Sequence, residues 1–189
     1  MTYIYLDTET TGFGKKDVVI QLAFIVQKNG EFEAYETLCR PPIDVNIKKG
    51  ASEVHGLYKS DVAFEPLLED TDAYKKLLLL NRPSTICFIH NAMFDIRLLK
   101  QSGFTNRMTV IDTLAYARKY NNTTISNKLQ EIRKTREVSK YEKSIMEKLG
   151  IEQISAHDAL GDVVSLASYV VSIIKHGNYN ELMEFKYTK

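Results

Sequence analysis

The chain opens with Thr2-Tyr3-Ile4-Tyr5-Leu6-Asp7-Thr8-Glu9, in which apolar, β-branched and aromatic residues lead into two acidic ones. This composition predicts that Thr2–Leu6 is a short buried strand that delivers Asp7 at its end. Residues two apart on a strand project from the same face, so the carboxylates of Asp7 and Glu9 should point to one place. Two adjacent carboxylates repel each other, and we therefore expect a cation between them. The alternative for this unit alone is a strand end with solvated acidic residues.

The remaining pattern predicts an α/β fold, with a mixed sheet and helices packed against it. Asn29-Gly30 is a strong hairpin signal, and strands and helices alternate after Pro41-Pro42. Asp112 is well placed to cap the helix that follows it. The expected further strands are Val18–Val26, Phe32–Cys39, Thr85–Ile89 and Met108–Ile111. The expected helices are Pro66–Leu80, Ala92–Lys100, one or two within residues 125–149, and His157–Lys175, with short helical pieces in Asp44–Asp61.

Composition indicates one globular domain spanning residues 1–189. Hydrophobic residues make up 44% of the chain and charged residues 26%. The apolar runs are too short to cross a membrane, and no signal peptide is recognisable, so we expect a cytoplasmic protein without a membrane partner. Cys39 and Cys87 are expected to be free thiols. A net charge of +1 does not by itself indicate a nucleic-acid binder, although clustered carboxylates could cancel basic residues elsewhere.

Two further acidic units lie at predicted element ends. In His90-Asn91-Ala92-Met93-Phe94-Asp95, Asn91 is a natural helix N-cap that would place Asp95 one turn inside the helix. The alternative is an ordinary first-turn acid. In His157-Asp158-Ala159-Leu160-Gly161-Asp162, His157 is expected just before the helix. Asp158 and Asp162 share a helix face, so spacing alone leaves open which of them binds metal.

Taken together, these units suit a site for two divalent cations. Carboxylate oxygens are the ligands that Mg²⁺ and Mn²⁺ prefer. Two such ions can clamp an in-line phosphoryl displacement. A histidine with a pKa near neutrality is the natural general base for the attacking water.

The three units resemble the exonuclease motifs of the DEDDh 3′–5′ exonuclease family. They are most similar to those of the proofreading epsilon subunits of bacterial DNA polymerase III, and Val54-His55-Gly56-Leu57 and Val110–Ala115 also look like that group. The resemblance spans residues 3–175, which leaves 176–189 as a C-terminal tail. It implies a ribonuclease H-like fold, with a five-stranded mixed sheet and helices on both faces.

The resemblance also implies a role for each site residue. Asp7, Glu9, Asp95 and Asp162 would hold two Mg²⁺ or Mn²⁺ ions, and His157 would be the general base. Asp158 would then only start the helix. The pocket for the 3′-terminal nucleotide would be lined by Thr8, Thr10, Thr11, His55, Asn91 and Phe94.

The implied activity is hydrolysis of single-stranded DNA 3′ ends to nucleoside 5′-monophosphates, as in proofreading. A replicative polymerase or a sliding clamp would be the candidate protein partner. One alternative is an exoribonuclease that trims RNA 3′ ends, because no residue named above discriminates a 2′-OH. The other is a catalytically silent nucleic-acid-binding adaptor. The filled catalytic positions argue against the adaptor.

Two segments depart from the epsilon-like pattern. Residues 128–148 contain Lys128, Arg133, Lys134 and further basic residues among glutamates, which predicts either a solvated helical face or a basic wall beside the substrate. Asn180–Phe185 resembles a clamp-binding motif with Met183 and Phe185 at the apolar positions. The alternative, which we favour, is that Leu182, Met183 and Phe185 pack on the domain as a terminal turn.

Overall fold

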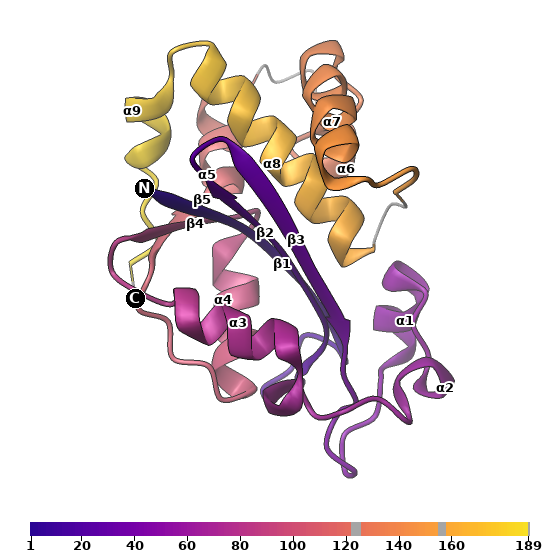
Figure 1. Cartoon of the computed structure of the whole chain (residues 1–189). Helices are drawn as coiled ribbons and strands as arrows, with labels where there is room; N and C mark the ends of the chain where they lie inside the picture. Colours follow the sequence, from indigo (N-terminus) through magenta and orange to yellow (C-terminus); the bar gives the residue numbers. More distant parts are fainter. Residues whose placement is uncertain (122–125, 155–157, 189) are drawn as a thin grey trace.

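A five-stranded mixed sheet forms the centre of the molecule (Figure 1). The computed structural model describes residues 1–121, 126–154 and 158–188. The strand order is β3-β2-β1-β4-β5, in which β1 pairs antiparallel with β2 and parallel with β4, and β4 pairs parallel with β5. This is the mixed sheet predicted from the sequence. The strands are β1 (Thr2–Thr10), β2 (Val19–Lys28), β3 (Glu31–Leu38), β4 (Thr85–Ile89) and β5 (Thr109–Asp112).

The first strand is longer than its sequence suggests. We expected it to end at Leu6, but β1 continues through Asp7 and Glu9 to Thr10. Asp7 lies opposite Ala23 and Glu9 opposite Gln21 on β2, and the register shifts only between Glu9 and Thr10. Pairing with β2 therefore keeps the acidic residues in the strand despite their low strand propensity.

The hairpin and the fourth strand match their predictions. Asn29 and Gly30 have φ angles of 54° and 87°, the left-handed conformation that a tight two-residue hairpin turn requires. The turn joins Lys28 to Glu31 in register. Thr85–Ile89 is fully buried and forms β4 with the predicted bounds.

Helices cover both faces of the sheet, and alternate residues of the strands pack against the two layers. On one face Tyr5, Ile25 and Phe88 pack against residues of α5, α6, α7 and α8. On the other face Leu6 and Phe24 pack against residues of α3 and α4 (Figure 1). The helices are α1 (Lys49–His55), α2 (Lys59–Val62), α3 (Asp72–Leu80), α4 (Ala92–Gln101), α5 (Thr113–Tyr120), α6 (Leu129–Ile132), α7 (Arg136–Leu149), α8 (Ala159–Lys175) and α9 (Tyr179–Met183).

The helix predicted over Pro66–Leu80 is divided. A 3-10 turn, η1 (Leu68–Asp70), precedes α3, and Thr71 separates the two. The Thr71 hydroxyl accepts a hydrogen bond from the backbone N–H of Tyr74 at 3.2 Å, which starts α3 at Asp72. A local N-cap therefore divides a segment whose apolar periodicity looked continuous.

The tail packs against the edge of the sheet. The Asp112 N–H donates to the Phe185 carbonyl, and the Tyr187 N–H donates to the Val110 carbonyl, each at 2.9 Å. Leu182 is fully buried. This packing agrees with the terminal-turn alternative, and clamp binding through the same side chains would first require their release. Within the described ranges, none of the helices is long and apolar enough to span a membrane.

Candidate active site

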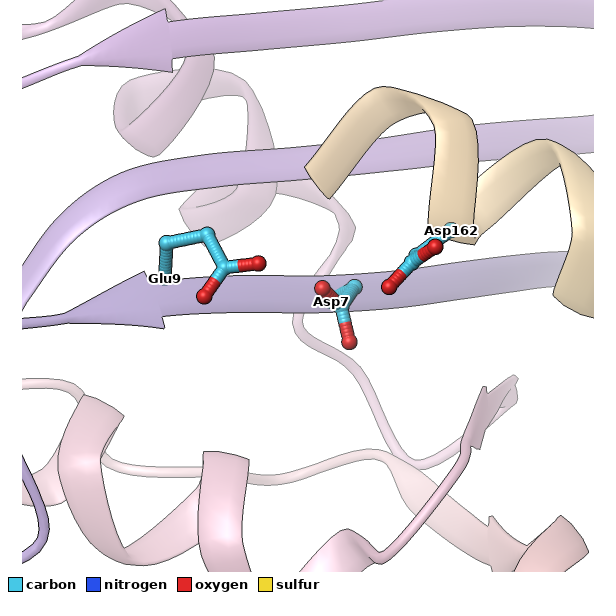
Figure 2. Close-up of side chains that lie close together, drawn as sticks. All are labelled: Asp7, Glu9 and Asp162. Carbon is cyan, nitrogen blue, oxygen red and sulfur yellow. The ribbon is translucent and has the colours of Figure 1, made fainter. Parts of the chain in front are cut away.

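Three carboxylates converge where the end of β1 meets the first turn of α8. One oxygen from each of Asp7, Glu9 and Asp162 lies within 4.8 Å of the others, and all three residues are partly buried. Asp7 and Glu9 continue the sheet face of Tyr5, which packs against α8. Figure 2 shows the three side chains directed toward a common region. The shared face predicted for Asp7 and Glu9 is thus present, and a residue more than 150 positions away completes the group.

Asp95 lies beside this group, with its side chain held by β1. It occupies the first turn of α4 and is only 2% exposed. Its Oδ1 atom accepts hydrogen bonds from the backbone N–H of Thr8 at 3.1 Å and from the Thr8 hydroxyl at 2.8 Å. Thr8, which we expected to line the substrate pocket, is buried. Its two hydrogen bonds orient Asp95.

Burial and mutual repulsion raise the pKa values of these acids. Burial raises the pKa of Asp7 well above its ordinary value, and the charges of Asp95, Asp162 and Glu9 raise it further. The same two effects raise the pKa of Glu9 to about 8. Burial also raises the pKa of Asp95 to about 7, although the hydrogen bonds from Thr8 oppose the shift. In the described part of the chain, no lysine or arginine forms an ion pair with Asp7 or Glu9. A cation from solution would relieve this repulsion.

The start of α8 gives Asp158 and Asp162 different surroundings. Asp158 is the N-cap, and its side chain accepts from the Gly161 N–H at 3.3 Å and from Gln21 Nε2 at 2.9 Å. Asp162, one turn later, joins Asp7 and Glu9. The carboxylate of Asp158 is thus engaged by its own helix and by β2, whereas that of Asp162 faces the acidic residues of β1. His157 lies outside the described residues.

Both ring nitrogens of His55 form hydrogen bonds, and one of these bonds ties the ring to the end of β1. Its Nδ1 atom accepts from the Leu57 N–H at 3.0 Å, so Nε2 carries the proton and donates to the Thr10 carbonyl at 3.1 Å. Burial lowers the pKa of His55, which keeps the ring neutral. Within the predicted nucleotide pocket, His55 can therefore offer a ring surface but no free nitrogen.

Thr10 and Thr11 shape the turn that follows β1. The Thr10 hydroxyl donates to the Gly12 carbonyl at 3.0 Å. The Thr11 hydroxyl donates to Asp17 Oδ1 at 3.1 Å and accepts from the Val18 N–H at 3.0 Å. Both threonines are buried. Their side chains are committed to the turn, and the backbone N–H and carbonyl of Thr11 are bonded to Val18 and Lys48.

α4 begins as predicted, with Asn91 at the N-cap position and Asp95 in the first turn, but the Asn91 side chain does not supply the cap. Asn91 is in the left-handed conformation, with φ 79°, and its side chain forms no cap hydrogen bond. The Asp112 carboxylate accepts instead from the backbone N–H groups of Asn91 and Ala92, each at 3.2 Å. Asp112 also accepts from Leu114 and Ala115, as predicted for the cap of α5. One carboxylate thus caps two helices, and the Asn91 side chain is exposed.

An aromatic pair joins the turn that follows β1 to α4. The rings of Phe94 and Phe13 are 5.5 Å apart and tilted, and Phe13 is 62% exposed. Arg97 NH1 donates to the Phe13 carbonyl at 3.0 Å, which ties the turn to α4. Sequence reasoning identified Phe94 but missed Phe13, whose only signal was an apolar residue between Gly12 and Gly14.

A groove leads from the acidic group between α1, α5 and α6. It has a volume of about 910 Å³, and Asp162 lies in its wall. Arg118 and Lys128 supply positive charge and Val54 and Leu114 apolar surface, while Glu53 and Glu131 add negative charge beside Asp162. The basic and apolar side chains are of the kinds that contact the phosphates and bases of a nucleic-acid strand. Of the basic segment 128–148, Lys128 lines the groove, whereas Arg133 pairs with Glu142 inside the fold.

Residues 4–169 match the family model described as exonuclease. The chain belongs to the exonuclease family. The match covers the three acidic units and most of the sheet and helices, and it identifies the protein as a nuclease. A comparison with curated proteins finds no match.

Solved structures of several exonucleases share the fold. A structure of exonuclease X in complex with 5′ overhanging duplex DNA has a TM-score of 0.67 at 22% identity, covering 96% of each chain. Exonuclease I of E. coli in complex with a dT13 oligonucleotide has a TM-score of 0.66 at 20% identity, covering 97% of this chain but 43% of its own. Cell-death related nuclease 4 has a TM-score of 0.63 at 16% identity, covering 93% and 64% of the two chains. This exonuclease therefore spans nearly all of exonuclease X but less than half of exonuclease I.

Proposed function

We propose that this exonuclease is of the DEDDh type and hydrolyses single-stranded DNA from the 3′ end to nucleoside 5′-monophosphates. The observation that carries the proposal is the convergence of Asp7, Glu9 and Asp162 within 4.8 Å, with Asp95 beside them. Repelling carboxylates at the mouth of a groove weaken the fold unless a ligand compensates them, and such sites are candidates for function. We further propose that residues 1–189 act as one exonuclease domain.

The donor set fits divalent cations. All the converging groups are carboxylates, the hard oxygen ligands that Mg²⁺ and Mn²⁺ prefer. Asp7, Glu9, Asp95 and Asp162 would hold the ions, with Asp95 oriented by Thr8. When bound, two such ions would make a water more acidic and offset the charge that develops on the leaving oxygen. The carboxylates would release their protons as the ions bind.

The remaining residues would hold the strand and move a proton. The exposed ring of Phe13 against Phe94 provides a surface for base stacking, and Arg118 and Lys128 would face the phosphates. His157, adjacent to Asp158 in sequence, would take the proton from the attacking water. His157→Ala should then retain Mn²⁺ and DNA binding but slow hydrolysis by roughly 10²- to 10⁴-fold in single-turnover assays. Loss of Mn²⁺ affinity in this variant would make His157 a ligand and refute the base assignment.

The choice of DNA rests on the resemblance of the motifs to those of proofreading subunits. The strongest alternative substrate is an RNA 3′ end, because the groove residues named above do not discriminate a 2′-OH. In the proofreading role, a mismatched primer terminus should be degraded faster than a paired one, because an unpaired end can enter the site without melting. Equal rates on both termini would exclude that role.

Oligonucleotides of one sequence, prepared as DNA and RNA and labelled at the 5′ end, test the proposal directly. With Mg²⁺ or Mn²⁺ we expect a ladder that shortens from the 3′ end and releases mononucleotides, faster for DNA. EDTA should abolish it. Asp7→Asn protein, purified in the same way, is the matched control for a contaminating nuclease. Faster RNA trimming would transfer the proposal to the alternative substrate, and binding without cleavage in either series would favour the adaptor.

A further inference from the structure

A side chain of α6 contacts the carboxylate of Asp162. Gln130 Nε2 donates a hydrogen bond to Asp162 Oδ1. The helix that carries Gln130 is anchored by Leu129 and Ile132, which are 8% and 2% exposed. The donor is therefore presented to Asp162 from a packed element, on the wall of the same groove.

The orientation of the Gln130 amide is determined by its other neighbour. Arg133 NH1 lies 3.4 Å from Gln130 Oε1. Because arginine can only donate, the amide oxygen must face Arg133, and the NH₂ group must face Asp162. A reversed amide would place two donors together on one side and two acceptors together on the other.

Arg133 is in turn fixed by a largely buried ion pair. Its NH2 atom lies 3.0 Å from Glu142 Oε1, and the two side chains are 18% and 13% exposed. Glu142 Oε2 accepts from the hydroxyl of Ser165, a fully buried residue of α8, at 2.9 Å. The contacts thus run from α6 through α7 and return to α8 one turn after Asp162. This arrangement holds Gln130 in place independently of any ligand.

We propose that Gln130 is a positioning residue that orients the Asp162 carboxylate for divalent-cation binding. The inference rests on the proposed function, in which Asp162 is a metal ligand. By engaging one oxygen, the Gln130 amide restricts rotation of the carboxylate and holds it among Asp7 and Glu9, where the cation would bind. It also offsets part of the repulsion from Asp7 and Glu9. Hydrogen bonds of this kind orient metal ligands in proteins and tune their affinity.

This proposal also assigns a role to the segment 128–148. Its arginine at 133 is part of the support for Asp162, and Lys134 forms a surface ion pair with Glu131 at 2.7 Å. The segment is neither simply a solvated face nor uniformly a basic wall. Part of it supports the acidic group through the contact of Gln130 with Asp162.

The test compares Mn²⁺ affinity of the substrate-free protein by calorimetry in wild type, Gln130→Met and Lys134→Gln. Methionine matches the length of glutamine and lacks the donor, and Lys134→Gln removes only the surface pair on the same segment. Gln130→Met should bind Mn²⁺ roughly 10- to 100-fold more weakly. Its hydrolysis rate should largely recover at saturating Mn²⁺. Lys134→Gln should match wild type.

Arg133→Lys provides a second variant. Lysine can keep the ion pair with Glu142, but its single ammonium group cannot at the same time donate to Gln130 as the second guanidinium nitrogen does. It should weaken Mn²⁺ binding in the same direction by a smaller factor. Wild-type affinity in folded Gln130→Met would overturn the proposal, as would a rate loss that saturating Mn²⁺ does not relieve. If wild type itself binds no Mn²⁺, the proposed metal site fails and this inference fails with it.

Discussion

The protein buries carboxylates in two neighbouring places with opposite electrostatic outcomes. Burial alone would raise the pKa of Asp17, but hydrogen bonds from Lys48, Gly14 and Thr11 outweigh it and lower the pKa. Lys48 Nζ lies 2.5 Å from Asp17 Oδ2. At Asp7 and Glu9, by contrast, burial and like charges both raise the pKa. The first carboxylate is stabilised by its own fold, and the second pair is destabilised by it.

The difference separates a structural carboxylate from a ligand-binding one. The donors around Asp17 close the turn between Thr11 and Val18, where a Cβ on Gly12 would lie 2.7 Å from Lys48 Cδ and 2.9 Å from Asp17 Oδ2. Nothing else is needed to satisfy that carboxylate. Asp7 and Glu9 have two further acids beside them, one of which, Asp162, lies in the wall of the groove, and a cation or protonation would relieve their repulsion.

The largest effect is expected from Asp7→Asn. The substitution removes a charge that the proposed cations require, so hydrolysis should fall by more than the roughly 10- to 100-fold typical of losing an orienting group. In EDTA the variant should melt at the wild-type temperature or above, because one repelling charge is gone. Mononucleotide release and thermal melting measure the two effects. Full activity would show that Asp7 is not a ligand, and a lower melting temperature in EDTA would refute the repulsion argument.

Stability of the metal-free protein should fall as pH rises. The pKa of Glu9 is raised from 4.5 to about 8 in the folded state, so the native protein holds a proton that the unfolded chain releases in that window. Stability from this group is therefore fully present below the unfolded pKa and is lost as pH rises through the folded pKa.

We expect a loss of up to about 5 kcal/mol across the window, since one pKa unit corresponds to about 1.4 kcal/mol; because the acids share their protons, the loss belongs to the group and not to Glu9 alone. Denaturant melts in EDTA measure it. Excess Mg²⁺ should reduce the loss, because bound cations replace the protons. Asp17 acts in the opposite sense, and its contribution is lost only as pH falls through its lowered pKa. If the free energy of unfolding in EDTA does not change between pH 4.5 and about 8, the unfolded and folded pKa values of Glu9, then Asp7 and Glu9 do not differ from Asp17 in the way proposed.

Asp17→Asn should destabilise the fold by about 1 to 3 kcal/mol, because the Gly14 amide and the Thr11 hydroxyl lose a charged acceptor. The cost is moderated because Lys48 is 59% exposed and can be solvated. Metal affinity should be unchanged. Lys16→Gln, an exposed neighbour in the same turn, is the control. Chemical denaturation measures the loss of stability, and Mn²⁺ titration measures metal affinity. Weaker Mn²⁺ binding without destabilisation would show that Asp17 takes part in metal binding and is not a structural carboxylate.

The elements that could be predicted from sequence are those governed by local chemistry. The Asn29-Gly30 turn depends on two residues that tolerate positive φ, and β4 is a short apolar run bounded by a polar loop. The end of β1 could not be predicted in this way, because its pairing with β2 continues past Leu6. The N-cap position of Asn91 was predicted, but the absence of a cap hydrogen bond from its side chain was not. Asp112, 21 residues away, accepts from the first two N–H groups at the start of α4, a contact that only the tertiary structure brings about.

The site was predictable to the extent that its members share a strand or a motif. The spacing of Asp7 and Glu9 places them on one face whatever the fold is. The choice of Asp162 over Asp158 depended on the family resemblance, because both residues occupy the same helix face. Gln130 gave no signal at all. A polar residue on a short helix has no distinguishing pattern until tertiary structure brings it to a carboxylate.

The smallest effect is expected from Asp158→Ala, which tests the boundary between the two kinds of carboxylate. Loss of the N-cap should cost about 1 kcal/mol. Part of this cost should be offset at high pH, because the charge of Asp158 contributes to the raised pKa of Asp7 and Glu9. Hydrolysis should remain close to wild type, whereas Asp162→Ala should be inactive. Asp158→Ser, which keeps a capping oxygen without the charge, should recover stability. If Asp158→Ala instead loses Mn²⁺ affinity while Asp162→Ala retains it, the metal ligand is the helix cap, and the structural carboxylate is Asp162.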